Sequence, residues 1–294
     1  MTRFQDALAS GRFVVTAELN PPKGTDLSEV LGKAQALRGV VDAFNLTDCT
    51  GARMAMAPIA VAHLLLDQGI EPILQVTGRD RNRIAIQAEL LAASALGIEN
   101  IAIMSGDPPG TGDHPEAKAV FDLEAIGILK AASALMQGHD LAGNPLKGTP
   151  RFHLGAVVNP GAKDLDKELR RLEEKIAAGA RFFQTQAVYD PDKFSAFMKQ
   201  VEHYRLPFLA GIIVLKSAGM ARNLNQNLPG VLVPEHLIAE LENAPDRTAK
   251  GIEISARIIR EVRSLCQGVH IMAIGWERYI PAILAQAGVA VPAS

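Results

Sequence analysis

The sequence predicts an α/β protein built as a single (β/α)8 TIM barrel over residues 1–294. Eight apolar runs are bounded by turn-forming residues, helical periodicity fills the stretches between them, and the length suits a barrel of about 250 residues with extensions. A doubly wound open sheet is the alternative, but no G-x-G-x-x-G turn follows the first run. No Pro-, Gly- or Ser-rich linker separates two domains.

The apolar runs are the predicted strands, and the first one shows how their ends are recognised. "FVVTAEL" contains Val14, Val15 and Ala17, and the run stops before Pro21 and Pro22, which cannot continue a strand. The eight predicted strands are 13–19, 43–47, 72–77, 101–106, 152–158, 181–186, 208–215 and 270–274.

Helical periodicity lies between these runs. The stretch 25–39 begins with Asp26 as the predicted N-cap, has Glu29 three residues on, and ends at Gly39 as the predicted C-cap. Two further stretches, 83–97 and 167–180, are predicted to form amphipathic helices that cover the sheet. The inner face of the first is formed by Ile84, Ala88, Leu91 and Ala95, and that of the second by Leu169, Leu172 and Ile176. Residues 136–150 are predicted to form a surface loop between the fourth helix and the fifth strand.

Composition excludes several classes of function. The net charge of −2 provides no broad electrostatic surface for nucleic acid or an anionic membrane. No stretch offers about 18 uninterrupted apolar residues, and the first residues lack a secretory apolar core, so a cytoplasmic protein with no membrane span is expected. Cys49 and Cys266 cannot form a disulfide framework, and no metal site is predicted, because the single Cys266–His270 spacing favours core packing.

Polar side chains gather at the carboxyl ends of the predicted strands, where a barrel keeps its active site. They are Glu18, Asn20, Thr47, Asp48, Gln75, Thr77, Asp107, Asn159, Gln184 and Gln186. Partial burial between apolar neighbours would raise the pKa of Glu18 and suit a proton donor, although capping a turn or pairing with an arginine is an equally weighted alternative. Gln184 and Gln186 lie on one side of their strand, where an amide can match the edge of a heterocycle or anchor a loop.

Two further segments allow both a functional and a structural interpretation. In "MSGDPPGTGD", Gly106 permits a close backbone approach and Asp107 presents a carboxylate, but a tight structural turn would use the same glycines and prolines. The basic run 79–83 and Lys175 could bind an anionic cofactor, or could lie in solvent.

The motifs "TAELNPPKG", "SGDPPG" and "AAGARFFQTQAVYD", in this order, resemble the 5,10-methylenetetrahydrofolate reductase family across residues 10–290. The resemblance implies a (β/α)8 barrel that binds FAD and works in two steps. NADH or NADPH reduces the flavin and leaves, and the flavin then reduces methylenetetrahydrofolate to 5-methyltetrahydrofolate in one-carbon metabolism and methionine biosynthesis.

The resemblance also implies roles for single residues. Glu18 matches the acid that opens the folate ring to an iminium ion, Asp107 matches an aspartate beside flavin and pterin, and Gln186 matches a pterin or nicotinamide contact. The flavin positions that it implies are Thr47, Gln75, Gly106, Asp107, Asn159 and Lys175, with Lys175 near the diphosphate.

The sequence departs from the family pattern at four positions: Asp48, Gln75, Ser105 and Leu224. Ser105 stands where the family has an arginine, and Leu224 stands where it has a phenylalanine that stacks on the nicotinamide cofactor. These two changes affect the expected flavin affinity and the identity of the electron donor. The alternative hypothesis is therefore a flavin- or folate-binding subunit that needs an electron-transfer partner subunit. A homo-oligomer is a further option, and an aldolase-like barrel would require a Schiff-base lysine, for which Lys216 is the candidate.

Overall fold

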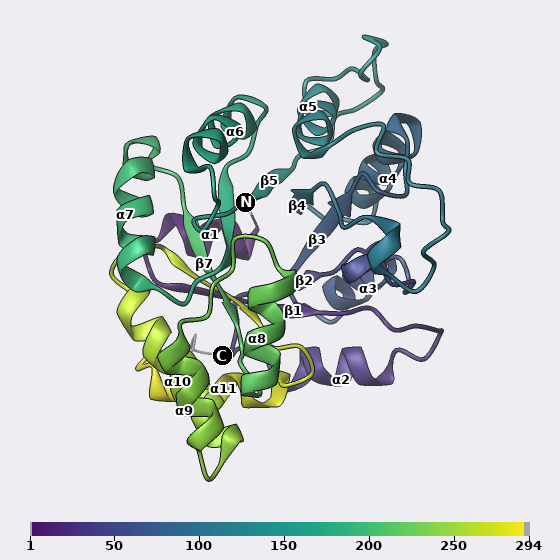
Figure 1. Cartoon of the computed structure of the whole chain (residues 1–294). Helices are drawn as coiled ribbons and strands as arrows, with labels where there is room; N and C mark the ends of the chain where they lie inside the picture. Colours follow the sequence, from purple (N-terminus) through teal and green to yellow (C-terminus); the bar gives the residue numbers. More distant parts are fainter. Residues whose placement is uncertain (1, 291–294) are drawn as a thin grey trace.

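The eight strands close into a barrel in which each strand pairs in parallel with its sequence neighbours (Figure 1). This computed structural model describes residues 2–290. The strands are β1 (Val14–Leu19), β2 (Ala43–Leu46), β3 (Pro72–Thr77), β4 (Asn100–Met104), β5 (His153–Val158), β6 (Phe182–Ala187), β7 (Phe208–Ile213) and β8 (Gly268–Met272). Pairing between β1 and β8 closes the ring, with Thr16 opposite His270. The predicted fold class is confirmed.

Helices surround the barrel and shield the outer face of its strands (Figure 1). They are α1 (Arg3–Ala9), α2 (Ser28–Ala36), α3 (Pro58–Asp67), α4 (Arg83–Ala95), α5 (Ala125–Met136), α6 (Leu165–Ala177), α7 (Pro191–Val201), α8 (Ala218–Asn227), α9 (Glu235–Asn243), α10 (Arg247–Val262) and α11 (Ile280–Gln286). Short 3₁₀ turns are η1 (Thr50–Ala52), η2 (Pro109–Thr111), η3 (Glu202–Tyr204) and η4 (Glu277–Tyr279). Among residues 2–290, no helix combines the length and apolar character that a membrane crossing needs.

Strand ends agree with the predicted ends to within two residues, and the difference at the fourth strand has a local cause. The fourth strand was predicted to run to Gly106 but ends at Met104, because Gly106 has a positive φ of +93° and turns the chain out of the sheet. The helix caps of α2 were also misplaced. Leu27 is the N-cap and Leu37 the C-cap, while Asp26 accepts a hydrogen bond from the Ser28 amide at 2.9 Å.

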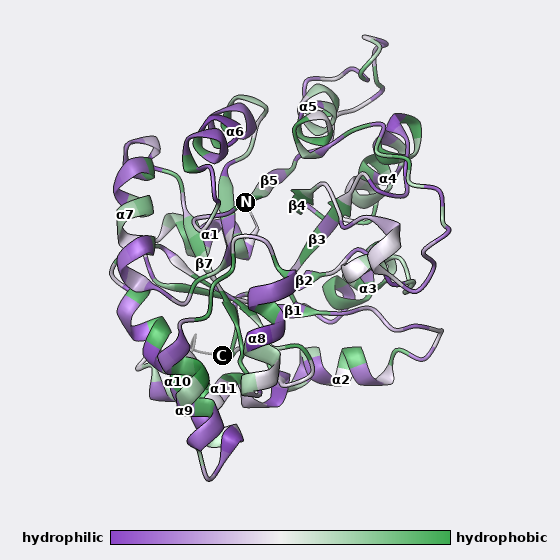
Figure 2. Ribbon diagram, in the orientation of Figure 1, coloured by the Kyte–Doolittle hydropathy of each residue, from purple (hydrophilic) through white to green (hydrophobic). Residues whose placement is uncertain are grey.

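The predicted inner face of α4 is wrong. Ile84 and Leu91 point to solvent with 74% and 39% of their surface exposed, and the buried residues are Ile86, Leu90 and Ala93. The helix is apolar on more than one side, so its periodicity fits two faces. The face expected for α6 is confirmed, since Leu172 is buried and Leu169 and Ile176 pack against the core. Figure 2 shows the contrast between the mostly hydrophobic strands and the largely hydrophilic α6.

Residues that point into the barrel form an apolar floor below a polar layer. The floor consists of Val14, Ala43, Ile73, Ala102, Phe182 and Leu209, closed from below by Phe4 of α1. The ring of Phe182 occupies the space where a Cβ at Gly155 would lie, 2.1 Å away, so that position requires glycine. Two residues further along the strands come Thr16, Asn45, Gln184 and His270, all buried and polar. Glu18 follows Thr16 by the same step, which directs its side chain into the barrel mouth.

Candidate active site

A cavity of about 720 Å³ opens at the carboxyl ends of the strands. Eight predicted site residues line it: Glu18, Gln75, Gly106, Asp107, Asn159, Lys175, Gln184 and Gln186. Its size and its mixture of apolar walls and converging polar groups are typical of a site for a small organic molecule. Thr47 lies outside that lining, as do Asn20, Asp48 and Thr77 of the predicted polar group. Thr47 is buried, and its hydroxyl donates to Asn20 Oδ1 at 2.8 Å.

Glu18 is paired with a histidine that sequence reasoning did not assign to the site. Glu18 Oε2 lies 3.7 Å from Nε2 of His270, and the two side chains are 17% and 5% exposed. The other ring nitrogen of His270, Nδ1, lies 3.0 Å from the Thr16 hydroxyl. The alternation of inward residues along β8 could have identified His270, which begins the predicted eighth strand.

The expected core packing of Cys266 is confirmed. Its thiol donates to the carbonyls of Val262 and Gly268, and burial raises its pKa to about 11. Across residues 2–290 there is no group of three or more His, Cys, Asp or Glu side chains that could hold a metal ion.

The His270 ring belongs to a hydrogen-bonded polar layer inside the barrel. Asn45 and Gln184 exchange two side-chain hydrogen bonds of 2.8 and 2.9 Å, and Gln184 Nε2 also donates to the Thr16 hydroxyl at 3.3 Å. Buried amides that satisfy each other in this way have few alternative arrangements. The layer therefore fixes Thr16 and, through it, the ring that faces Glu18.

Gln186 follows Gln184 on the same strand, and both residues line the cavity. A register shift between Gln184 and Ala187 marks a bulge in the pairing of β6 with β7, a common device for directing a side chain near a site. Gln186 Oε1 accepts a hydrogen bond from the Ala187 amide at 3.1 Å, which orients the amide group.

Asp107 is held at the cavity rim by the loop after β2. Its Oδ2 accepts a hydrogen bond from the Gly51 amide at 3.1 Å. The preceding Gly106 packs so closely that an added Cβ would lie 3.0 Å from Cβ of Thr77 and 3.2 Å from Cβ of Arg79. Gly106 is therefore required by backbone conformation and packing, and it places Asp107 against the loop.

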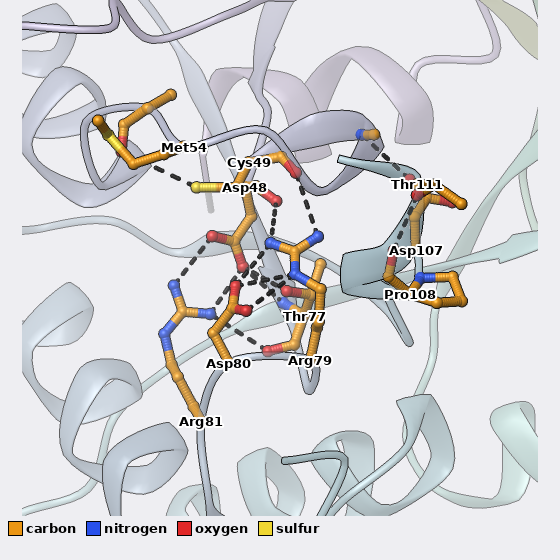
Figure 3. Close-up of polar contacts among 12 residues, drawn as sticks. Asp48, Cys49, Met54, Thr77, Arg79, Asp80, Arg81, Asp107, Pro108 and Thr111 are labelled. Atoms are coloured by element: carbon orange, nitrogen blue, oxygen red, sulfur yellow. Dashed lines mark hydrogen bonds and ion pairs between the residues drawn. The ribbon is translucent and has the colours of Figure 1, made fainter. Parts of the chain in front are cut away.

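Two arginines of the basic run 79–83, Arg79 and Arg81, form ion pairs with Asp80 and Asp48 (Figure 3). Arg83 pairs with Asp122. Arg81 binds both carboxylate oxygens of Asp48 at 2.7 and 2.9 Å and also pairs with Glu89 at 2.5 Å. Burial is the largest single effect on the pKa of Arg81 and lowers it, but the hydrogen bonds that Arg81 donates to Asp48 and the charges of Asp48, Glu89 and Asp80 together outweigh burial and raise the pKa. Arg79 is 2% exposed and pairs with Asp80. A solvent-exposed basic face is therefore excluded for Arg79.

One face of α6 carries three cations beside the cavity. Lys167, Arg171 and Lys175 follow one another at four-residue spacing, and all three line it. Lys175 is 5% exposed, and its Nζ donates to the Val157 carbonyl at 2.7 Å and lies 3.7 Å from Glu168. Burial lowers the pKa of Lys175, and the Glu168 carboxylate offsets part of that effect.

Lys216 stabilises another part of the cavity rim. Its Nζ donates to the carbonyl of Ile274, a cavity-lining residue with φ of +50°. A β-branched residue rarely adopts this conformation, so the lysine contact helps to stabilise a strained backbone. Lys216 is outside the cavity lining, as a structural role requires.

Fold and site together define a (β/α)8-barrel protein with a polar cavity at the carboxyl face. The family model described as "Methylenetetrahydrofolate reductase" matches residues 3–288. The chain belongs to the methylenetetrahydrofolate reductase family.

Individual relatives agree with the family match. The chain is 26% identical to methylenetetrahydrofolate reductase 2 of Schizosaccharomyces pombe, covering 96% of this chain and 46% of that protein. It is 25% identical to a probable NADH-type reductase of Oryza sativa, covering 97% and 50% respectively. The chain thus spans about half the length of these curated relatives.

A solved structure shares the fold. It is an uncharacterised protein from Clostridium thermocellum that binds two copies of 5-methyl-5,6,7,8-tetrahydrofolic acid. The TM-score is 0.66 over 97% of both chains, at 14% identity. The EDTA monooxygenase of Chelativorans matches with a TM-score of 0.58 at 13% identity over 96% of both chains.

Proposed function

We propose that the protein reduces 5,10-methylenetetrahydrofolate to 5-methyltetrahydrofolate, and that the barrel carries both the cofactor and the folate. The observation that carries the proposal is the Glu18–His270 pair at the mouth of the barrel, in the cavity that Asp107 and Gln186 also line. Membership of the family and the folate-binding neighbour support the same substrate.

FAD is the proposed cofactor, and the charges of the cavity fit it. Lys167 and Arg171 of α6 line the cavity beside Lys175, and an anionic diphosphate is stabilised by such a row of cations. Gln75, Gly106 and Asn159 would contact the ring system, and Thr47 would support that wall from beneath. The flavin, when bound, supplies the hydride chemistry, while the protein supplies orientation and electrostatics.

Glu18 is the proposed general acid. The folate must gain a proton on a nitrogen of its five-membered ring before that ring opens, and a carboxyl group directed into the cavity can deliver it from Oε2. His270, 3.7 Å away, keeps this oxygen oriented toward the cavity. Gln186 binds the amide-like edge of the pterin, and Asp107 orients it from the opposite loop.

The proposed electron donor is NADH or NADPH, and curated relatives carry both names. The second candidate function is a flavin- and folate-binding subunit that receives electrons from a partner protein. What favours it is the absence of an arginine at Ser105 and of an aromatic ring at Leu224, a half-buried residue of α8 that packs on the core. Leu224 offers no aromatic ring to stack on a nicotinamide cofactor, and Ser105 offers no positive charge to its phosphates.

An anaerobic absorbance spectrum distinguishes the two functions. Purified protein is supplied with FAD, and the flavin bands are followed before and after addition of NADH and, separately, NADPH. Bleaching followed by recovery on adding methylenetetrahydrofolate is the expected result. The partner-dependent function predicts a different result. FAD binds but neither nucleotide reduces it, and once reduced chemically it reduces the folate. Absence of flavin binding would overturn the assignment of FAD.

A further inference from the structure

Asp113 joins three of the loops that surround the barrel mouth. It lies in the loop after β4, and its Oδ2 accepts a hydrogen bond from Nζ of Lys23 in the loop after β1. Its Oδ1 accepts a second bond, of 2.9 Å, from the Met54 amide in the loop after β2. Thr50 and Asp107, which belong to two of these loops, line the proposed active site. None of the roles proposed above uses Asp113.

The Asp113 side chain is a carboxylate at neutral pH and can accept both bonds. The bond from Lys23 and, next, the bond from the Met54 amide lower the pKa of Asp113 to about 2. The side chains of Asp113 and Lys23 are 28% and 59% exposed, and an ion pair this exposed contributes little stability by itself. The importance of Asp113 therefore depends on the loops that it connects.

The loop after β2 has a backbone that needs support from its neighbours. Cys49, Gly51 and Ala52 have φ angles of +48°, +62° and +55°, all in the left-handed region. Cysteine and alanine rarely adopt this conformation, because their Cβ comes too close to a backbone carbonyl oxygen. Such residues persist only where the surrounding structure holds them, and they cluster at functional sites.

Two neighbouring segments hold this loop. Arg79 Nη1 donates to the Cys49 carbonyl at 3.1 Å, and Figure 3 shows the guanidinium directed at that oxygen. Gly112 packs on Ala52 so closely that an added Cβ would lie 1.8 Å from the Ala52 carbonyl oxygen. Because Asp113 is the next residue, its bonds to the other loops keep Gly112 in this position.

The loop held in this way orients Asp107. The Gly51 amide donates to Asp107 Oδ2 at 3.1 Å. Gly51 lies within the left-handed stretch, so the direction of its N–H bond depends on that stretch keeping its conformation. Asp107 is exposed at the cavity rim, and the bond from Gly51 selects one direction for its carboxylate.

We propose that Asp113 is a positioning residue that acts through Asp107. By joining the loops after β1, β2 and β4, it keeps the Gly51 amide where it directs the Asp107 carboxylate toward the folate. The inference rests on the proposed function, which assigns Asp107 to the orientation of the pterin. Asp113 itself lies outside the cavity lining and does not touch the substrate.

Asp113→Ala removes both bonds, and Asp122→Ala is its matched control. Asp122 lies in the same loop, its side chain is also 28% exposed, and it too accepts bonds from a basic side chain and a backbone amide, both of Arg83. These bonds lead to α4 instead of the loop after β2. Hydrogen exchange over residues 48–57, followed by mass spectrometry, should become faster in Asp113→Ala and stay unchanged in Asp122→Ala.

The rates of the two half-reactions show whether the loop matters for chemistry. Asp113→Ala should slow hydride transfer to methylenetetrahydrofolate by about three- to tenfold, the range of one typical hydrogen bond. Reduction of the flavin by the nicotinamide should be nearly unchanged, as should both half-reactions in Asp122→Ala. A general loss of structure would instead slow both half-reactions together.

A double-mutant cycle tests whether Asp113 acts through Asp107. Effects of independent residues add as free energies, whereas a residue that acts only through another has no further effect once that other residue is gone. Asp113→Ala should therefore leave the folate half-reaction of Asp107→Ala almost unchanged. An undiminished effect of Asp113→Ala in the Asp107→Ala background would overturn the proposal.

Lys23→Met is the second variant, and it replaces Asp113→Ala if circular dichroism shows that the latter does not fold. It removes the ion pair but keeps the bond from Met54, and the Met56 amide still donates to the Pro22 carbonyl at 2.8 Å. It should change hydrogen exchange and the folate rate in the same direction as Asp113→Ala, but less.

Two further results separate this inference from the proposed function. If hydrogen exchange becomes faster while the folate half-reaction keeps its wild-type rate, Asp113 supports the loop alone, and the positioning role is wrong although the proposed function stands. If the wild-type protein does not reduce methylenetetrahydrofolate, the proposed function fails and the positioning role fails with it.

Discussion

At the scale of single residues, Glu18 has the most specific expected role. Glu18→Gln keeps the shape and removes the proton, so the folate half-reaction should fall by at least about 100-fold, the lower range for a general acid. Reduction of the flavin by the nicotinamide does not need that proton and should be nearly unchanged. Stopped-flow measurement of the two half-reactions checks both expectations.

Two companion variants make the Glu18 test specific. Glu29→Gln, at an exposed carboxylate of α2, should affect neither half-reaction. His270→Asn leaves the acid in place but disturbs its orientation, so it should slow folate reduction less than Glu18→Gln does. Equal loss of both half-reactions in Glu18→Gln would contradict its assignment as the acid.

The same residues show how far the sequence can predict a site. Glu18, Asp107 and Gln186 were predicted to lie together because each stands at the carboxyl end of an apolar run, and parallel strands bring these ends to one edge; all three line the cavity. The contacts of Thr47 and Lys175 were not, because Asn20 and the Val157 carbonyl, which come from other segments, determine where those side chains point. His270 was missed because its role depends on closure of the barrel, which places β8 beside β1.

At the scale of elements, the strands were predictable and the faces of some helices were not. Prolines and glycines mark the strand ends, whereas α4 is apolar on two sides and its buried side depends on how it docks. The structure thus predicts that the same substitution at two adjacent leucines changes the free energy of unfolding by very different amounts. Leu90→Ala should lower the free energy of unfolding by about 2–5 kcal/mol, because Leu90 is fully buried.

Leu91→Ala should change the free energy of unfolding by less than about 0.5 kcal/mol, because Leu91 faces solvent. Urea unfolding of both variants at one pH makes the comparison. Equal destabilisation would mean that α4 is rotated relative to the orientation described above. If Leu91→Ala instead lowers the molecular mass in solution, the exposed face of α4 is an interface between copies of the chain.

At the scale of the whole molecule, the two ends of the barrel differ in polarity and in access to solvent. The carboxyl end keeps a polar cavity, whereas the other end is sealed by α1 and an aromatic group. His153 belongs to this group, with its ring centroid 5.7 Å from that of Phe4 and 4.8 Å from that of Phe182. Its Nδ1 is buried without a hydrogen-bond partner among residues 2–290. A charged imidazole is therefore disfavoured there.

This arrangement makes the stability of the barrel depend on pH. Burial lowers the pKa of His153 from 6.5 to about 4. Below about pH 6.5, His153 binds a proton in the unfolded chain but stays neutral in the folded chain. The free energy of unfolding therefore falls as the pH is lowered toward 4. The contribution of His153 to this loss between pH 7 and 4.5 is roughly 2–3 kcal/mol.

His153→Phe removes the titrating group and keeps an aromatic ring, so its free energy of unfolding should fall less than that of the wild type over this interval. Urea titrations at pH 7 and 4.5 measure the difference, with His236→Phe, at an exposed position on α9, as the control. If the larger ring disrupts packing, His153→Leu serves the same purpose. If the His153 variants show the same pH dependence as the wild type, His153 is protonated in the folded barrel as readily as in the unfolded chain. The end of the barrel near α1 would then be open to water.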